Sequence, residues 1–350
     1  SSDVCSSDLL GLAFRAPLLS FIFGKVDADV MENSMVYFFY TVLSYPFIAL
    51  YDAGASIFRA QENTRGPMVI SIISNVMNIV GNGILIWVFH MGVAGAAIST
   101  LVSRIFCAVV VLYQLRKDRQ PIVVRDYLKI RPDGKMIGRI LALGIPSGIE
   151  NSMFQLGKLA IQSTVSTLGT TAIAAQAMTN MLEMLNGTAV IGVGIGLMTV
   201  VGQSLGAGRK DEAVYYMKKL MIFSEVFLIA CCAVVYVLAR PITMIGGMEA
   251  KSAEMCLDMM FWITIVKPIV WMFAFIPAYG MRAAGDVKFS MITSCITMWT
   301  FRFCLCVYLI RVCGMGPMAV WIGMFTDWTV RAIVFGLRFK SGKWMEHKVV

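Results

Sequence analysis

The residues best suited to chemistry in this chain are polar and charged side chains along one otherwise apolar segment, residues 138–165. They are Ser147, Glu150, Asn151, Gln155, Lys158 and Gln162. At 100° per residue, these positions fall on one arc of about 140° of a helix, while Ile149 and Leu156 lie on the opposite side. The pattern predicts a helix face that lines a cavity. The alternative is a polar face that packs against a neighbouring polar helix.

A second apolar segment, residues 171–206, repeats this pattern with Gln176, Asn180 and Glu183, which share one helix face. Carboxylate and amide oxygens suit a hard cation, so Glu150 and Glu183 are candidates to accept a proton or hold Na⁺. Both could also attract a cationic substrate. For Glu183, the alternative is an interfacial residue near the external surface.

Lys267 lies inside a third apolar segment and directly precedes Pro268. We expect this cation either to neutralise a carboxylate or to extend to the membrane surface. Pro268 frees a backbone carbonyl, which predicts a conformational hinge.

Other motifs have simpler interpretations. GVGIG (192–196) resembles a nucleotide-binding loop but lies within an apolar span, so close helix packing is the better explanation for its glycines and for Gly202 and Gly206. The i, i+4 spacing of Asp327 and Arg331 predicts a local ion pair near the cytoplasmic end of a helix. The chain shows no arrangement of a nucleophile and a base. We therefore expect neither an enzyme nor a cofactor other than a coupling ion.

The elements that position these residues are membrane-spanning helices. Hydrophobic residues make up 58% of the 350 positions and charged residues 15%, and mean hydropathy is +0.74. Because about 20 apolar residues span a bilayer as a helix, the composition predicts an all-α, polytopic helical bundle. Ten spans are expected: Leu9–Gly24, Met35–Ile57, Met68–Phe89, Val93–Leu115, Gly138–Val165, Thr171–Gly206, Ala213–Arg240, Glu254–Tyr279, Lys288–Arg311 and Pro317–Arg338.

The net charge of +9 comes from basic residues in alternate connections between these spans. Such alternation indicates topology rather than nucleic-acid binding, and it predicts a cytoplasmic C-terminus. Arg59 and Arg282 are interpreted as gate or topology residues of cytoplasmic loops. The nine cysteines show neither a disulfide framework nor a CxxC pattern, and we interpret them as packing residues.

The sequence also repeats itself internally. Residues 58–68 align with 281–291, and Pro46 aligns with Pro268. The first four spans therefore match the last four, as expected for two lobes related by an axis along the membrane normal. We expect an incomplete N-lobe over 9–115, a cytoplasmic linker over 116–137 and a C-lobe with its tail over 138–350. Residues 1–8 are expected to be an artefact.

Several motifs, taken in order, resemble the MATE (multidrug and toxic compound extrusion) family. They are GVAGAAIST (92–100), GIPSGIE (144–150), LGTTAIAAQA (168–177), VGQSLGAGRKDEA (201–213), RAAGDVKFSM (282–291), GPMAVWIGMFTDWTVRA (316–332) and RFKSGKW (338–344). The resemblance implies a six-plus-six helix architecture, with the first two helices and part of the third missing from this chain. It also implies export of cationic or amphipathic organic compounds in exchange for Na⁺ or H⁺, by alternating access of the two lobes. A monomer in a bacterial cell membrane, contacting lipid and no nucleic acid, is the corresponding expectation.

The chain departs from that family at the positions that would couple transport to an ion. Trp271 stands where some MATE subgroups place an acidic residue, and Phe154 stands at the acidic position of the 138–165 helix. The choice between Na⁺ and H⁺ therefore stays open. The alternative function is a related lipid-linked oligosaccharide flippase, which would favour a strongly cationic cavity that these mixed residues do not predict. A channel or an intramembrane enzyme is the alternative from another class.

Overall fold

The computed structural model describes residues 28–117 and 133–346, and within these ranges it contains helices and no strand. The chain forms two compact units, unit 1 (Ser1–Arg131) and unit 2 (Pro132–Val350), and the division falls within the expected linker. The expected artefact, the expected span Leu9–Gly24 and most of the linker lie outside the described residues. The assignment of the units as transporter lobes stays a prediction.

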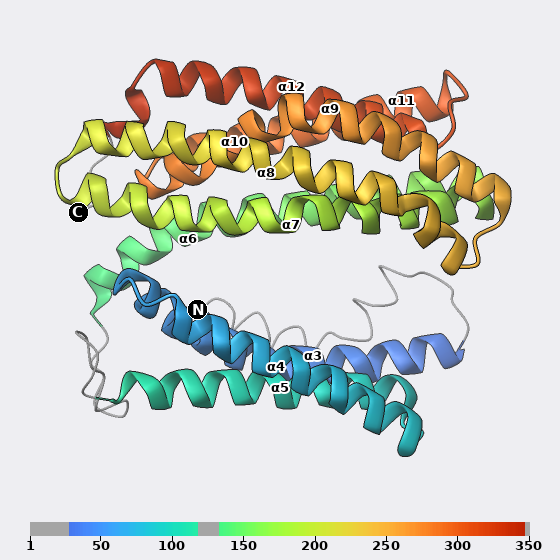
Figure 1. Cartoon of the computed structure of the whole chain (residues 1–350), viewed down its shortest axis with the longest axis horizontal. Coiled ribbons are helices and arrows are strands. Elements are labelled where there is room, and N and C mark those ends of the chain that lie inside the picture. Colours follow the sequence, from blue (N-terminus) through green and yellow to red (C-terminus); the bar gives the residue numbers. More distant parts are fainter. Residues whose placement is uncertain (1–27, 118–132, 347–350) are drawn as a thin grey trace. The chain divides into compact units, whose positions relative to one another are not determined.

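The described part of unit 1 consists of three long helices, the second of which ends in a π-helical turn. They are α3 (Ala28–Ala60), α4 (Arg65–Gly83) with the π-helix η1 (Ile84–Val88), and α5 (Gly92–Leu115). Helix α5 packs against both α3 and α4 (Figure 1), and Phe58, Ile70 and Val111 belong to the apolar cluster of the unit. The Ser74 hydroxyl donates a hydrogen bond of 3.1 Å to the Ser103 carbonyl, which joins α4 to α5.

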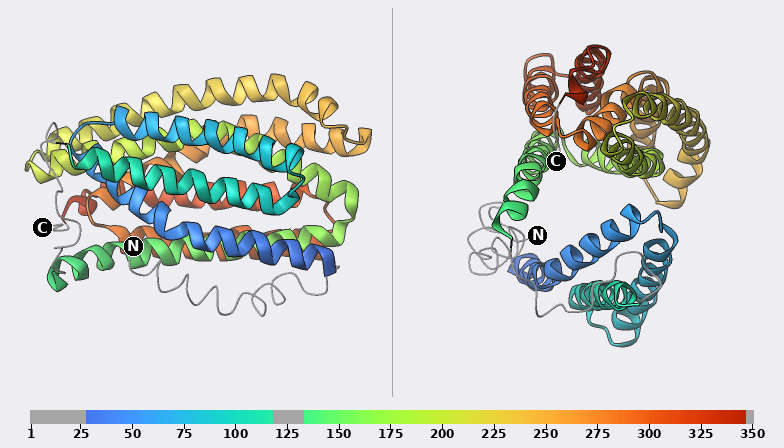
Figure 2. Two further views of the ribbon diagram at one scale, coloured as in Figure 1. Left: turned by 90° about the horizontal axis from the view of Figure 1, so that it is seen from below. Right: turned by 90° about the vertical axis from the view of Figure 1, so that its left-hand side faces the viewer.

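Unit 2 holds the remaining helices. They are α6 (Gly134–Val165), the 3₁₀ turn η3 (Ser166–Leu168), α7 (Thr170–Gly206), α8 (Lys210–Ile245), α9 (Ala250–Ala283), α10 (Val287–Thr297), the π-helix η4 (Met298–Cys304), α11 (Leu305–Arg311), α12 (Met318–Lys340) and the 3₁₀ turn η5 (Lys343–Met345). Helix α9 packs against α7, α8 and α12, while α6 packs against α10, η4 and α11 (Figures 1 and 2). This packing sets the faces of α6, α7, α9 and α12 that carry the site.

Local sequence explains how α6 and α7 begin. The Asp133 carboxylate caps α6 by accepting hydrogen bonds from the backbone N–H groups of Lys135 (2.9 Å) and Met136 (3.4 Å). Gly169 separates η3 from α7 with φ +92°, a backbone conformation that residues with a side chain rarely adopt. Helices α6 and α7 are thus joined by a short connection that consists of η3 and Gly169.

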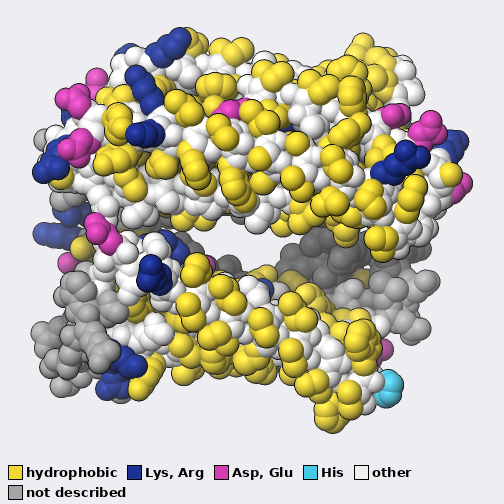
Figure 3. Space-filling view, in the orientation of Figure 1, with side chains coloured by type: hydrophobic (Ala, Val, Ile, Leu, Met, Phe, Trp, Pro, Cys, Tyr) yellow, Lys and Arg dark blue, Asp and Glu magenta, His cyan; other side chains and the backbone are white. Residues whose placement is uncertain are grey.

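The expected helical membrane architecture is confirmed. Each expected span after Leu9–Gly24 coincides with a helix of the described ranges, and eight of these helices are long and apolar enough to cross a membrane. Helix α6 does not meet that criterion, because its polar stripe lowers its mean hydropathy. Figure 3 shows the visible face of unit 2 as hydrophobic over its middle, with most charged side chains near its two ends. That distribution fits a bundle whose middle lies in hydrocarbon.

The expected span Lys288–Arg311 is not one regular helix, because the π-helix η4 interrupts it between α10 and α11. Helix α12 approaches this segment closely at Gly323, where an added Cβ would lie 2.8 Å from the carbonyl oxygen of Arg302. The contact involves backbone, so no side chain can rotate away to relieve it. Glycine at 323 is therefore what allows α12 to pack on η4.

The interpretation of the 192–206 glycines is wrong for most of them. A Cβ added at Gly194 would lie 2.7 Å from the Tyr279 ring, so that glycine does sit at a close helix contact. At Gly192, Gly196, Gly202 and Gly206, no atom of the described residues lies within 4 Å of an added Cβ. These positions face outward from α7 because its buried face follows other residues, such as Val190, Leu197 and Val201.

The Gly323 contact generates a stability prediction. Gly323→Ala should destabilise the protein by about 1–3 kcal/mol, because α12 and η4 must separate to accept the methyl group. Gly336→Ala on the same helix is the matched control, since no atom lies within 4 Å of its added Cβ. Thermal unfolding of the purified chain in detergent, followed by tryptophan fluorescence, compares the two. Equal melting temperatures for both variants would contradict the role given to Gly323.

Candidate functional site

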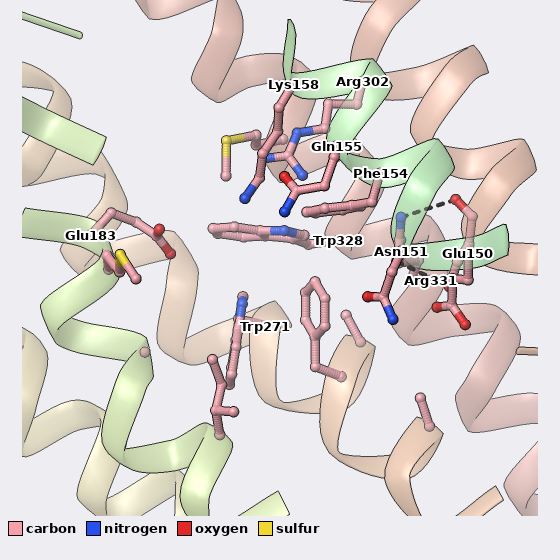
Figure 4. Close-up of a pocket in the computed structure, with 18 of the residues that line it drawn as sticks. Glu150, Asn151, Phe154, Gln155, Lys158, Glu183, Trp271, Arg302, Trp328 and Arg331 are labelled. Atoms are coloured by element: carbon pink, nitrogen blue, oxygen red, sulfur yellow. Dashed lines mark hydrogen bonds between the residues drawn. The ribbon is translucent and has the colours of Figure 1, made fainter. Parts of the chain in front are cut away.

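Unit 2 contains a cavity of about 760 Å³ formed by α6, α7, α9, α10, η4 and α12. Its apolar wall is largely aromatic, with Phe154, Trp271, Phe275, Tyr279 and Trp328 (Figure 4). The Trp271 and Phe275 rings stack with centroids 4.9 Å apart. A cavity of this size with aromatic walls and a few polar groups is typical of a site for a small organic molecule.

Most of the candidate residues named from the sequence line this cavity. They are Glu150, Asn151, Gln155, Lys158, Gln176, Asn180 and Glu183. Lys267 does not line the cavity and instead lies behind Glu183. Figure 4 shows the α6 residues on one side of the cavity and Glu183 on the opposite side, carried by α7. The structure thus brings the two polar faces together, while the functions assigned to the residues stay predictions.

The polar stripe of α6 faces the cavity along most of its length. Gln162 lines the cavity with the residues already named, and Ser147 does not. On the other side of α6, Ile149 and Leu156 are exposed, as expected for residues that contact lipid or another apolar surface. The sequence pattern of α6 therefore corresponds to its environment in the fold.

Lys267 and Glu183 form an ion pair between α9 and α7. The Lys267 Nζ atom lies 2.5 Å from Glu183 Oε1 and also donates to the Glu183 carbonyl oxygen at 3.0 Å. The side chain of Lys267 is 0% exposed and that of Glu183 is 21% exposed. Of the two expectations for Lys267, neutralising a carboxylate is the one observed. Glu183 faces the cavity rather than the external surface, and Pro268 lies within an α9 that remains helical.

Glu150 forms an ion pair with Arg282, which the sequence pattern had placed in a cytoplasmic loop. Arg282 Nη2 donates a hydrogen bond of 2.8 Å to Glu150 Oε1, and both residues line the cavity. Arg282 does not lie in a loop, because it occupies the last turn of α9 and its guanidinium lies over the Tyr279 ring; its role as a gate or topology residue stays a prediction. Its charge neutralises Glu150 within the site.

A third charged group is centred on Asp327 of α12. Arg331 Nε donates to Asp327 Oδ1 at 2.7 Å, and its two terminal nitrogens donate to the hydroxyl (3.1 Å) and carbonyl (3.0 Å) of Ser294. Arg302 of η4 lies farther away, with Nη1 at 3.9 Å from Asp327 Oδ2. The expected Asp327–Arg331 pair is present, but its expected place near the end of the helix is wrong. Both residues lie in the middle of α12 and are buried, with Arg331 on the cavity wall.

Arg302 and Arg331 also line the cavity, although neither was among the site residues predicted from the sequence. A signal was available for Arg302, since it lies inside the expected span Lys288–Arg311 and a basic residue there is a candidate by default. Trp328 gave no such signal, because an aromatic residue in a membrane helix is ordinarily a packing residue. Only the arrangement of α6, η4 and α12 brings it to the cavity (Figure 4).

The expected Na⁺ site near Glu150 and Glu183 has no preformed ligand cage among the described residues. No group of three or more Asp, Glu, His or Cys side chains is close enough there to hold a metal ion. Each carboxylate instead has a basic partner, Arg282 or Lys267. Sodium binding at either carboxylate would have to compete with that partner, and it stays a prediction.

Comparisons with known proteins agree with this architecture. A family model described as MatE matches residues 146–308, and one described as lipid II flippase MurJ matches residues 5–131. The chain is 25% identical to the probable multidrug resistance protein NorM of Thermotoga maritima, over 98% of this chain and 74% of that protein. The names of these relatives are those of transporters.

Solved structures match the same fold. An outward-facing multidrug resistance MATE family transporter of the MOP superfamily matches with a TM-score of 0.85 and 18% identity, over 99% of this chain and 79% of that chain. A MOP superfamily transporter from Pyrococcus furiosus, described as having a binding pocket of reverse polarity, matches with a TM-score of 0.88 and 17% identity, over 99% of this chain and 78% of that chain. These structural likenesses establish the fold.

The Glu183–Lys267 pair generates a prediction about stability. Glu183→Gln should cost about 3–5 kcal/mol, because it leaves the Lys267 charge buried without a carboxylate. The double variant Glu183→Gln/Lys267→Met should recover most of that loss, since no unpaired charge remains. Thermal or denaturant unfolding of the wild type, both single variants and the double variant gives the coupling energy.

The matched control for this cycle is the exposed pair Arg209–Glu212, whose side chains are 67% and 48% exposed. Replacing both by Gln should change stability by less than about 1 kcal/mol. Additive effects in the Glu183/Lys267 cycle would mean that the two charges do not stabilise each other.

Proposed function

We propose that this chain, as a member of the MATE family and a multi-pass membrane transporter, is a secondary antiporter. Its substrates would be amphipathic organic compounds, and inward flow of Na⁺ or H⁺ would drive their export. The observation that carries the proposal is the ion pair between the buried Lys267 and the partly exposed Glu183 at the wall of an aromatic cavity. Glu183 is a carboxylate that could exchange a cation, and it lies at the wall of a cavity that could hold an organic molecule.

The coupling step follows from competition at Glu183. A proton or Na⁺ that arrives at this partly exposed carboxylate displaces the Lys267 ammonium from it. Lys267 is 0% exposed, so its charge then lies in a low-dielectric interior without a counter-charge. The resulting cost favours any conformation in which Lys267 finds another acceptor or reaches water.

Pro268 gives α9 a way to reach such a conformation. A proline inside a helix lacks one backbone hydrogen bond, so α9 bends more easily beside Lys267. Because α9 also carries Trp271, Phe275 and Tyr279, bending it would change the shape of the cavity wall. Cation exchange at Glu183 and substrate affinity would then be linked through one helix, as alternating access requires.

The cavity supports the amphipathic part of the expected substrate class. The ring faces of Trp271, Phe275 and Trp328 can contact apolar or planar parts of a substrate. The side-chain amides of Asn151 and Gln155 can both donate and accept hydrogen bonds. Such a wall accepts varied compounds without a single fixed pose. The relatives named as multidrug resistance proteins are consistent with this breadth.

A lipid-linked oligosaccharide flippase is the second candidate. The match of the MurJ family model to residues 5–131 favours it, and so do Arg282, Arg302 and Arg331, which make the cavity more basic than the sequence analysis expected. A flippase would move a lipid headgroup without exporting soluble dyes. Export of soluble compounds therefore separates the two functions.

The proposed membrane is the bacterial cell membrane, with the C-terminus on the cytoplasmic side. The basic residues Arg338, Lys340 and Lys343 at the end of α12 support this orientation. A single cysteine introduced at exposed Lys340, in a chain whose other cysteines are replaced, should be labelled by a membrane-impermeant maleimide only after cells are opened. Labelling in intact cells would reverse the proposed topology.

The test of function is dye export from an efflux-deficient bacterium that expresses the protein. We expect energised cells to extrude at least one of a panel of cationic, zwitterionic and anionic amphipathic dyes faster than cells with an empty vector. Collapsing the proton gradient at constant Na⁺ gradient, and the reverse, identifies the coupling ion. Export that persists when both gradients are collapsed would contradict secondary antiport.

The coupling role of the ion pair is tested separately from its structural role. The double variant Glu183→Gln/Lys267→Met should fold but export the dye at least about tenfold more slowly, since its cavity lacks the exchangeable carboxylate. The Arg209→Gln/Glu212→Gln variant should export like the wild type. Recovery of both stability and export in the double variant would show that the pair only supports the fold.

A further inference from the structure

The charges around the unit 2 cavity do not balance. Glu150 is paired with Arg282, and Glu183 is paired with Lys267. The remaining acid at the site is Asp327. Three basic groups remain for this one carboxylate, namely Arg302, Arg331 and Lys158. The described part of the site therefore carries a surplus of positive charge.

Arg331 occupies one oxygen of Asp327, while the other oxygen, Oδ2, has no hydrogen-bond partner and lies 3.9 Å from Arg302 Nη1. The Arg331 Nε atom binds Asp327 Oδ1 at 2.7 Å, while Ser294 accepts hydrogen bonds from its other two nitrogens. This guanidinium is held in place by three acceptors from α10 and α12. Arg331 is therefore a fixed, fully bonded part of the wall.

Arg302 is buried but lacks such partners. It is 5% exposed, its Nη1 atom is 3.9 Å from Asp327 Oδ2, and neither its Nε nor its Nη1 atom has a hydrogen-bond acceptor. A buried N–H group without an acceptor is costly, and for a charged group the cost is larger. The side chain reaches the cavity from the π-helix η4, a type of segment often found at functional sites.

Lys158 of α6 brings a second cation without a hydrogen-bonded carboxylate to the same place. No carboxylate of the described residues lies within 4 Å of its Nζ atom, which sits 5.1 Å from the centre of the Phe154 ring. The Arg302 guanidinium carbon is also 5.1 Å from that ring centre, and that of Arg331 is 5.8 Å from it. Three positive charges therefore surround one aromatic ring, where like charges repel unless an anion joins them.

Figure 4 shows Lys158 and Arg302 on the same side of the cavity, near the amide of Gln155 and the ring of Trp328. A planar guanidinium and a mobile ammonium together suit a carboxylate, sulfonate or phosphate group. The neighbouring aromatic faces suit the apolar body that carries such a group.

We propose that the unit 2 cavity binds the anionic group of an amphipathic molecule between Arg302 and Lys158, against the ring of Phe154. The proposal rests on the proposed transport function and names its substrate class, which is organic anions or zwitterions rather than simple cations. Amphipathic carboxylates and sulfonates are one source of this group, and phosphate-bearing lipids are the other.

The test compares two dyes that share one ring system and differ in charge. Fluorescein is an anion near neutral pH, and rhodamine 123 is a cation. The purified full chain in a neutral detergent is titrated into each dye, and fluorescence anisotropy gives the Kd. We expect fluorescein to bind at least about tenfold more tightly than rhodamine 123.

Charge reversal at Lys158 should remove this preference. Lys158→Glu is expected to weaken fluorescein binding by about 10- to 100-fold and to strengthen rhodamine 123 binding, because one of the two cations becomes an anion. Lys219→Glu is the matched control. Its ammonium lies 5.2 Å over the Tyr215 ring in the same i, i+4 arrangement, but outside the cavity, so it should leave both Kd values unchanged.

Competition distinguishes the two sources of the anion. Displacement of fluorescein by phosphatidic acid in mixed micelles, but not by a soluble aromatic sulfonate, would identify a lipid phosphate as the ligand. Displacement by the sulfonate alone would identify soluble organic anions. Both results support the anion site.

Two results would overturn the proposal: tighter binding of rhodamine 123 than of fluorescein, or unchanged fluorescein affinity in Lys158→Glu. Lys158 is exposed in unit 2, so this variant should fold, and its thermal unfolding verifies that. Different results would reject the proposed function and the anion site. Absence of dye export with the anion preference intact would reject antiport, whereas export with a preference for cations would reject only the anion site.

Discussion

Charge pairing in a medium without water is the constraint on which unit 2 depends. Hydrocarbon offers no hydrogen bonds, so each buried charge needs a partner from the protein itself. Lys267 finds one in Glu183, and Arg331 finds one in Asp327. These pairs join α7 to α9 and anchor α12 to α10 through Ser294. The helices that form the cavity are thus fixed by the same charges that line it or lie behind it.

The sequence was sufficient to predict the helices and two faces of the cavity. The length of the apolar segments identified the spans. A helix that crosses the membrane forms all its backbone hydrogen bonds internally and needs about 20 apolar residues, which can be found in a sequence. The stripe of α6 was informative for the same reason. Polar residues on an otherwise apolar helix need a polar or wet environment, so Glu150, Gln155 and Lys158 could be placed on a cavity before any fold was known.

The pairing of these residues could not be predicted, because it depends on how helices distant in the sequence pack. Glu150 and Arg282 belong to α6 and α9, and no periodicity within either helix indicates their contact. Arg302 depends in addition on a π-helical turn and on the close approach of α12 at Gly323. The glycines of α7 show the opposite case. Their motif is typical of close helix packing, but most of them lie on an exposed face of the helix.

The difference between paired and unpaired charges also separates two tasks within one site. In the proposed coupling step, a cation that binds Glu183 shifts the Glu183–Lys267 pair from the observed paired arrangement to a separated one. A group such as Arg302, whose contact with Asp327 is long and not hydrogen-bonded, gains a hydrogen-bonded counter-charge when an anion arrives. If Lys158 and Arg302 bind the substrate while Glu183 exchanges the ion, the two events use different atoms on opposite sides of one cavity. In the proposed antiport, the two events would then influence each other through the shared cavity and helix α9 rather than through one common ligand.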